Sequence, residues 1–115
     1  MNISSDRVGD IGIVRLSEPR LMYPLLSDFT QVVSALLTGG PAKVLVDLSS
    51  VSYVDSATIG CLMDLYRQAS TAGGTLALSS VQKRVETMLT MTGAHNFLKL
   101  YATEADALRA MGGAA

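Results

Sequence analysis

Short apolar runs and amphipathic stretches alternate along this chain. Residues 11–16 form an apolar run that is rich in β-branched residues and bounded by polar ones, which predicts a strand. A weaker strand is expected over residues 3–9, forming a hairpin with it. Residues 43–48 are apolar almost without interruption, which favours a central strand covered on both faces. The remaining strands are predicted at residues 75–79 and 97–101.

The stretches between these strands carry the period of helices. After Pro24, which suits the first turn of a helix, apolar residues recur every three or four positions and so share one helix face. Gly39-Gly40-Pro41 is expected to end this helix. A second helix is predicted over roughly residues 57–72, ending at Gly73-Gly74. The apolar face of the first helix comprises Leu25, Leu26, Phe29, Val32, Val33, Leu36 and Leu37.

Two more helices are predicted toward the C-terminus. Ser80 is expected to cap a third helix that ends near Gly93. Thr103 and Asp106 resemble a capping box, with aspartate where glutamate is usual, and so open a final helix. The third helix is expected to bury Val81, Val85, Met88 and Leu89.

The order of these elements is β-β-α-β-α-β-α-β-α. Because strands and helices alternate from residue 24 onward, the fold class is α/β, a mixed, mostly parallel sheet of about five strands flanked by four helices. The whole chain, residues 1–115, is expected to form a single domain with its core over about residues 8–110. Residues 112–115 are expected to be a frayed tail.

Composition narrows the classes of function. The net charge is −1 and aromatic residues make up only 5% of the chain, so neither phosphate neutralisation nor base stacking is favoured and nucleic-acid binding is not expected. The N-terminus lacks a basic segment followed by an apolar run, and no apolar run approaches the length of a membrane span. We therefore expect a cytoplasmic protein with no signal peptide and no membrane insertion.

The residues that carry enzyme chemistry are sparse. His95 is the only histidine and falls in a turn after the third helix, so a hydrolytic triad is not expected. Cys61 is the only cysteine, which excludes an internal disulfide and suits a reducing cytoplasm. At helical spacing Cys61 falls on the same stripe as Leu62, Leu65 and Ala69, which predicts a buried, inert thiol rather than one activated by the helix dipole. We expect no catalytic residue, no metal and no cofactor.

The most informative junction lies where the central strand runs through a short polar loop into the second helix. Ser56 stands at the mouth of that helix, directly after Asp55. One interpretation is that Ser56 only caps the helix, its oxygen accepting a backbone N–H. The other is that Ser56 is an exposed phosphorylation site, because a helix N-terminus favours negative charge. Asp55 is itself an adequate cap, so the pair carries more polar oxygen than one helix end requires.

An apolar strip is predicted beside this serine. Ile59 and Met63 fall next to the buried stripe of the second helix, and Tyr66 borders the same strip. Such a strip is either a docking face for a protein partner or the ordinary edge of the core. Against a docked partner, a phosphate on Ser56 would add charge, bulk and a desolvation cost without any change of fold.

The order and spacing of several motifs together resemble a known family. The main motif is Val44-Leu45-Val46-Asp47-Leu48 followed by Val54-Asp55-Ser56-Ala57-Thr58-Ile59-Gly60. It continues in Ala72-Gly73-Gly74-Thr75-Leu76-Ala77-Leu78, Val81-Gln82-Lys83-Arg84-Val85, Leu89-Thr90-Met91-Thr92-Gly93, Phe97-Leu98-Lys99-Leu100-Tyr101 and Glu104-Ala105-Asp106-Ala107-Leu108. From about residue 8 to 110 the chain is similar to the STAS domain family of bacterial anti-sigma factor antagonists.

This resemblance implies a non-catalytic protein that works as a binding switch. It implies that Ser56 is phosphorylated by a serine-protein kinase that is also an anti-sigma factor. The unphosphorylated form would bind that factor and free the sigma factor, and a PP2C-type phosphatase would reset the switch. Thr58 is a second, less favoured acceptor. The implied partner surface comprises Asp55, Ser56, Ala57, Thr58, Ile59, Gly60 and Met63.

Two departures from the family pattern keep an alternative open. Thr58 stands where the antagonists often have glycine, and the segment from Ser17 to Pro24 lacks the usual glycine-and-aspartate turn. Within that segment Leu21, Met22 and Tyr23 form either a second apolar contact or packing under the sheet. The alternative function is a STAS scaffold or adaptor subunit in a stressosome-like or transporter-associated complex. A monomer or weak dimer would favour the antagonist, and a large assembly the scaffold.

Overall fold

Four α-helices pack against a five-stranded sheet in the structure, a computed structural model that describes residues 2–38 and 43–112. The strands lie side by side in the order β1-β2-β4-β6-β7. β1 is antiparallel to β2 and the other neighbours are parallel, which confirms the predicted mostly parallel sheet. The strands are β1 (Ile3–Val8), β2 (Ile11–Leu16), β4 (Lys43–Asp47), β6 (Thr75–Ser79) and β7 (Lys99–Tyr101).

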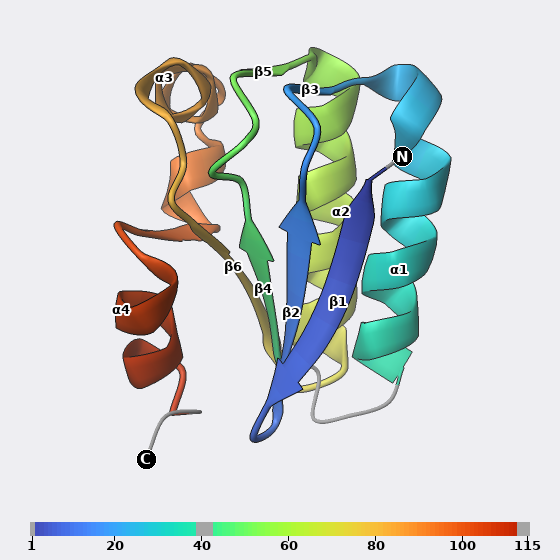
Figure 1. The fold of residues 1–115 in the computed structure, drawn as a ribbon, viewed down its shortest axis with the longest axis vertical. Helices are drawn as coiled ribbons and strands as arrows, with labels where there is room; N and C mark the ends of the chain where they lie inside the picture. The colour runs from blue at the N-terminus through green and yellow to red at the C-terminus, as the bar shows by residue number, and fades with distance from the viewer. Residues whose placement is uncertain (1, 39–42, 113–115) are drawn as a thin grey trace.

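The helices cover the two faces of this sheet unequally. Figure 1 shows α1 and α2 on one face and α4 on the other, with α3 to one side. Single turns of 3-10 helix precede α1 (η1, Tyr23–Leu25) and follow α3 (η2, Ala94–Asn96). The helices are α1 (Leu26–Thr38), α2 (Ser56–Thr71), α3 (Lys83–Thr92) and α4 (Glu104–Ala110).

Strand β4 lies in the middle of the sheet and packs on both sides, as its continuous apolar run predicted. Val44 and Val46 belong to the larger apolar cluster beneath α1 and α2. Leu45, which points the other way, belongs to the smaller cluster that includes Ala107 of α4. Successive residues of a strand face opposite sides, so a strand between two covered faces needs apolar residues at consecutive positions, as at Val44, Leu45 and Val46.

The predicted helix faces are confirmed in part by burial. Val85 and Leu89 of α3 are buried, whereas Met88 is only partly buried and Val81 precedes the helix. Phe29, Val33 and Leu37 of α1 are buried against the sheet. Helix α1 also approaches β2 closely, because a Cβ built on Gly12 would lie 3.1 Å from a Leu36 side-chain carbon. The glycine therefore lets a helix lie tightly on the strand.

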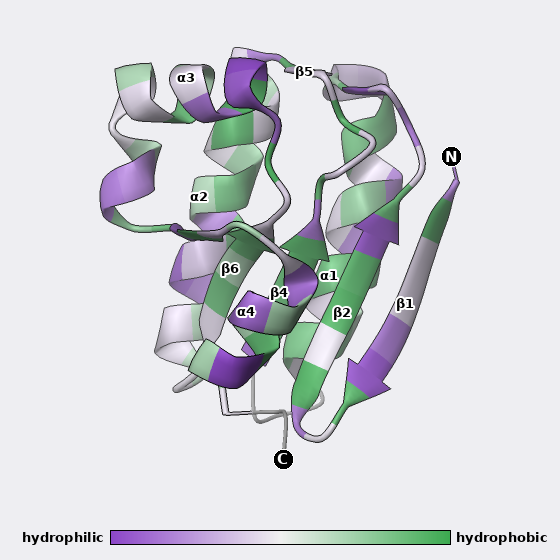
Figure 2. Cartoon of the chain, turned by 60° about the vertical axis from the view of Figure 1, so that its left-hand side comes forward, coloured by the Kyte–Doolittle hydropathy of each residue, from purple (hydrophilic) through white to green (hydrophobic). Residues whose placement is uncertain are grey.

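The edge of the sheet is polar. Figure 2 shows β1 with largely hydrophilic residues, in contrast to the hydrophobic β2 beside it.

On the face that α4 covers, Arg15 of β2 makes a two-point contact with the Glu104 carboxylate, at 3.0 and 2.9 Å. This pair fixes the start of α4 against the sheet.

Two local predictions are corrected and two lie outside the described residues. Ser80 does not cap α3: its φ is 57°, its N–H donates to the Tyr101 carbonyl at 3.0 Å, and Gln82 is the N-cap residue. Phe97 lies outside β7, because its N–H closes the η2 turn on Ala94, and its side chain is 54% exposed. The predicted stop at Gly39-Gly40-Pro41 and most of the predicted frayed tail lie outside the described residues.

Candidate functional site

A second, two-stranded sheet that was not predicted from the sequence lies at the mouth of α2. β3 (Arg20–Leu21) and β5 (Tyr53–Val54) are parallel and pair Arg20 with Tyr53 and Leu21 with Val54. Figure 1 shows both at the end of the molecule where α2 begins. Strands of two residues are too short to show an alternating pattern, so only the contact between distant segments reveals them.

Asp55, and not Ser56, caps helix α2. One carboxylate oxygen, Oδ1, accepts the backbone N–H of Thr58 at 2.9 Å, and α2 begins at Ser56. The interpretation of Ser56 as the capping residue is therefore wrong. An aspartate before the first helical residue satisfies one of the N–H groups that the helix leaves unpaired, and its charge is favourable there.

Thr58 is a buried structural residue in this site. Its side chain is fully buried, and its hydroxyl oxygen lies 2.7 Å from the Leu21 carbonyl oxygen and 2.6 Å from Asp55 Oδ1. Ile59 is only 6% exposed. The expectation of a partly exposed apolar strip at Ile59 is therefore wrong, and the side chains of Thr58 and Ile59 lie under the surface. Their place in a partner surface stays a prediction.

Asp55 also anchors the segment before α1. Its second carboxylate oxygen, Oδ2, accepts the Tyr23 N–H at 3.0 Å. Hydrogen bonds, above all from Thr58, hold the pKa of Asp55 below its ordinary value. Leu21 is fully buried, whereas the Tyr23 side chain is 75% exposed. Leu21 therefore packs in the core, and a second apolar contact through Tyr23 stays a prediction.

The outward surface of the first turns of α2 is formed by Ser56, Ala57, Gly60 and Met63, here called the α2 face. The first three are exposed and Met63 is partly buried. A Cβ built on Gly60 meets no atom within 4 Å, so this part of the helix surface is open. The ring of Tyr66, one turn further on, packs against that of Phe97 at a centroid distance of 6.2 Å.

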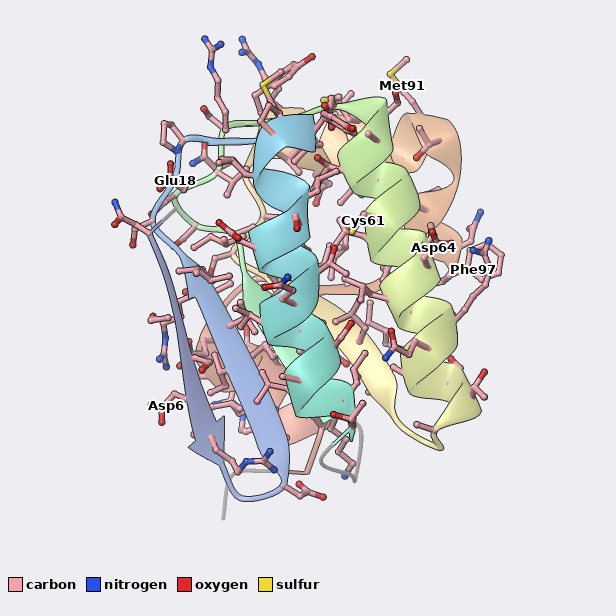
Figure 3. All side chains as sticks on the ribbon, turned by 90° about the vertical axis from the view of Figure 1, so that its right-hand side faces the viewer. Asp6, Glu18, Cys61, Asp64, Met91 and Phe97 are labelled. Carbon is pink, nitrogen blue, oxygen red and sulfur yellow. The ribbon has the colours of Figure 1, made fainter. Side chains whose placement is uncertain are left out.

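The other two chemistry-bearing residues lie away from the α2 face. Cys61 lies between α1 and α2 (Figure 3), with its sulfur 3.1 Å from the Thr30 hydroxyl oxygen. Burial raises the pKa of the Cys61 thiol, which agrees with an inert group. His95 is exposed in η2.

The described residues contain neither a cluster suited to a metal ion nor a helix suited to a membrane. Across residues 2–38 and 43–112, no group of three or more His, Cys, Asp or Glu side chains is placed to hold a metal ion. In the same part of the chain, every helix is too short or too polar to cross a membrane.

Comparison with known proteins identifies the family. The STAS domain model matches residues 2–107, and the chain therefore belongs to the STAS domain family. A relative from Thermotoga neapolitana, named as an anti-sigma factor antagonist, is 34% identical over 82 residues, which are 71% of this chain and 73% of the relative.

Solved structures agree with this assignment. The crystal structure of an anti-sigma factor antagonist from Thermotoga maritima superposes with a TM-score of 0.84 and 27% identity, covering 96% of this chain and 94% of that one. The unphosphorylated form of the Bacillus antagonist SpoIIAA has a TM-score of 0.81 at 18% identity, over 99% of both chains. Its phosphorylated form has a TM-score of 0.72 at 17% identity, over 95% of this chain and 98% of that one. At these identities the two SpoIIAA structures show a shared fold.

Proposed function

We propose that this protein is an anti-sigma factor antagonist in the cytoplasm, controlled by phosphorylation of Ser56. Unphosphorylated, its α2 face binds an anti-sigma factor that is also a serine-protein kinase, and a PP2C-type phosphatase restores this form. The observation that carries the proposal is that different residues cap the helix and remain exposed at its mouth. Asp55 supplies the cap, so the exposed Ser56 is left without a part in folding the helix.

The physical effect of phosphate supports a switch in binding without a change of fold. Phosphorylation adds a charge of about −1.5 to −2. Within the chain, the N-terminus of α2 accommodates this charge with a favourable contribution of roughly 0.3–1 kcal/mol. A partner pressed against the α2 face would instead have to desolvate and accommodate the phosphate, and binding would weaken.

The relatives support the same proposal. A relative that matches 71% of this chain is named as an anti-sigma factor antagonist. SpoIIAA, which shares the fold, has been solved in a phosphorylated and an unphosphorylated form. A fold that accepts phosphate in one member is compatible with the switch proposed for Ser56.

Phosphosite mapping on the protein isolated from its native cells, before and after stress, tests the proposal. We expect phosphate on Ser56 in an amount that changes with condition. A Ser56 that stays unmodified in every condition would contradict the switch. Phosphate on Thr58 is not expected, because the Thr58 hydroxyl is buried. Its detection there would contradict the assignment of Ser56 as the acceptor.

Binding of the source organism's anti-sigma factor kinases, expressed one by one, tests the docking face. Ser56→Asp is expected to weaken binding and Ser56→Ala to retain it. Gly60→Gln adds an uncharged side chain to the open surface of α2 and is also expected to weaken binding, without a cost to the fold. Ala105→Gln, on exposed α4, is the matched control and should bind normally. Equal binding by Gly60→Gln and Ala105→Gln would show that the α2 face is not the interface.

A second candidate function is a STAS scaffold or adaptor in a larger complex, such as a stressosome-like or transporter-associated assembly. Met91 and Phe97 are 81% and 54% exposed, and Figure 3 shows both projecting beyond α2. A contiguous apolar patch would mark an interaction site, and these two side chains are candidates for one. A concentration series in sedimentation velocity distinguishes the two functions: a monomer or weak dimer supports the antagonist, and a large assembly the scaffold.

A further inference from the structure

A small cavity with two arginines adjoins the mouth of α2. It has a volume of about 290 Å³ and is lined by Arg20, Ser52, Tyr53 and Arg84. Arg20 and Tyr53 are paired across the β3–β5 sheet, and Arg84 is the second residue of α3. We call this cavity the two-arginine notch.

The charges of the notch are not neutralised within the described part of the chain. The ion pairs there involve Arg15, Lys43, Arg67 and Arg109, whereas Arg20 and Arg84 are exposed and take part in none. Two like charges that line one small cavity repel each other. An anion placed between them relieves that repulsion, so the notch is suited to a negatively charged group.

The position of Arg84 is unfavourable for the stability of its own helix. The first turn of α3 begins with Lys83 and Arg84 and also holds one acidic residue, Glu86, and Gln82 makes no side-chain cap hydrogen bond. The N-terminus of a helix carries partial positive charge and favours acidic residues. Glu86 supplies that acidic charge, whereas Lys83 and Arg84 are unfavourable for the helix end, and Arg84 lines the cavity.

The notch is joined to the start of α2 by the chain and by a hydrogen bond. Tyr53 precedes Ser56 by three residues, and β3 is bonded to α2 through the Thr58 hydroxyl and the Leu21 carbonyl at 2.7 Å. Figure 1 shows β3, β5 and the start of α2 at one end of the molecule. A partner that docks on the α2 face therefore lies next to the notch.

We propose that the two-arginine notch binds carboxylate side chains of an acidic segment in the protein partner that docks on the α2 face. Guanidinium groups match carboxylates in shape and donate paired hydrogen bonds to them. The inference rests on the proposed function and extends it. A phosphate of about −1.5 to −2 on Ser56 offsets the two arginine charges, so phosphorylation removes the attraction for an acidic partner.

A titration with a short peptide tests the notch without any knowledge of the partner. The probe is an acetylated, amidated peptide of alternating aspartate and glutamate, and its control has the matching asparagine and glutamine sequence. Heteronuclear NMR of the full chain follows the signals of Arg20, Tyr53 and Arg84. We expect saturable shifts with the acidic peptide alone, weakened by salt, because the contact is between exposed charges.

Charge-matched variants locate the binding. The double variant Arg20→Gln with Arg84→Gln is expected to weaken binding of the acidic peptide roughly tenfold, because two charge-assisted contacts are lost. Arg7→Gln with Lys99→Gln removes the same charge from exposed residues elsewhere and should leave binding unchanged. Thermal unfolding of both double variants checks that they fold.

Three results would overturn the inference: equal shifts with the amide peptide, equal loss in the two double variants, or shifts at the notch with inorganic phosphate but not with the acidic peptide. The last would assign the notch to a free anion. None of these results contradicts the proposed function, because phosphosite mapping tests phosphorylation of Ser56 independently. Conversely, finding Ser56 unmodified would contradict the switch but would not alter the result of the peptide titration.

Discussion

Asp55 and Thr58 hold each other at the mouth of α2. Asp55 Oδ1 lies 2.9 Å from the Thr58 backbone nitrogen and 2.6 Å from its hydroxyl oxygen. The same hydroxyl lies 2.7 Å from the Leu21 carbonyl oxygen. A hydroxyl has one proton, so these two acceptors share a single donor. The pair therefore joins the cap of α2 to the small sheet, and Ser56 beside it remains exposed.

Removal of the Thr58 hydroxyl is expected to destabilise the fold. Thr58→Val keeps the shape of the side chain but takes the donor from two acceptors, one of them in a buried contact. The expected loss is about 1–3 kcal/mol in the free energy of unfolding, measured in urea. Thr58→Ser retains the hydroxyl and should lose less than Thr58→Val. A Thr58→Val protein as stable as the wild type would show that the hydroxyl does not join helix and sheet.

The contribution of Asp55 to stability is expected to depend on pH. Hydrogen bonds from Thr58 and Tyr23 lower its pKa in the folded protein below the ordinary 3.8. A lowered folded pKa means that the carboxylate stabilises the fold above pH 3.8, and that this stabilisation is lost as the pH falls through the folded value. Asp55→Asn has no such charge to lose.

Urea unfolding of wild type and Asp55→Asn, from neutral pH to below 3.8, measures this effect. The wild type should be more stable at neutral pH, and the difference should narrow at the acidic end. A difference that widens as the pH falls would contradict the assigned direction of the pKa shift.

Removal of the hydroxyl is expected to affect the free energy of unfolding differently at Ser79 and at Thr103. Ser79 is fully buried, and its hydroxyl has no hydrogen-bond partner among the described residues. Ser79→Ala is therefore expected to leave the free energy of unfolding unchanged or to raise it, since an unpaired buried hydroxyl costs roughly 1–3 kcal/mol.

Thr103→Ala is the comparison for Ser79→Ala. The Thr103 hydroxyl oxygen accepts the Asp106 N–H at 3.0 Å and caps α4, as the sequence predicted. Its removal is expected to cost about 1 kcal/mol in urea unfolding. A larger loss in Ser79→Ala than in Thr103→Ala would show that the Ser79 hydroxyl has a partner in solution.

Cys61 is expected to react slowly with iodoacetamide. Burial raises its pKa above the ordinary 9.0, so less thiolate is present near pH 8 than in an exposed thiol. The rate, followed by mass spectrometry, should rise when the protein is unfolded in urea. Asp64→Asn removes a charge that raises the same pKa and should speed the reaction of the folded protein slightly. Equal rates in the folded and unfolded states would contradict a protected thiol.

The local sequence patterns of this chain were sufficient to predict its main strands and helices. The continuous apolar run at residues 43–48 predicted a central strand, and β4 lies in the middle of the sheet. The spacing of Phe29, Val33 and Leu37 predicted the buried face of α1. These features depend on neighbours within a few residues and on a requirement for burial, so they can be recognised in the sequence.

The details of the site depended on contacts between distant segments. Nothing near Thr58 in the sequence indicates that its hydroxyl meets Leu21, 37 residues earlier. The sequence likewise does not indicate that Arg20 and Arg84 line one cavity. The motif by itself determined that a polar pair opens α2. Only the tertiary structure decided that Asp55 is the cap, Thr58 is buried and Ser56 is exposed, because burial is set by the packing of β3 against β5 and α2.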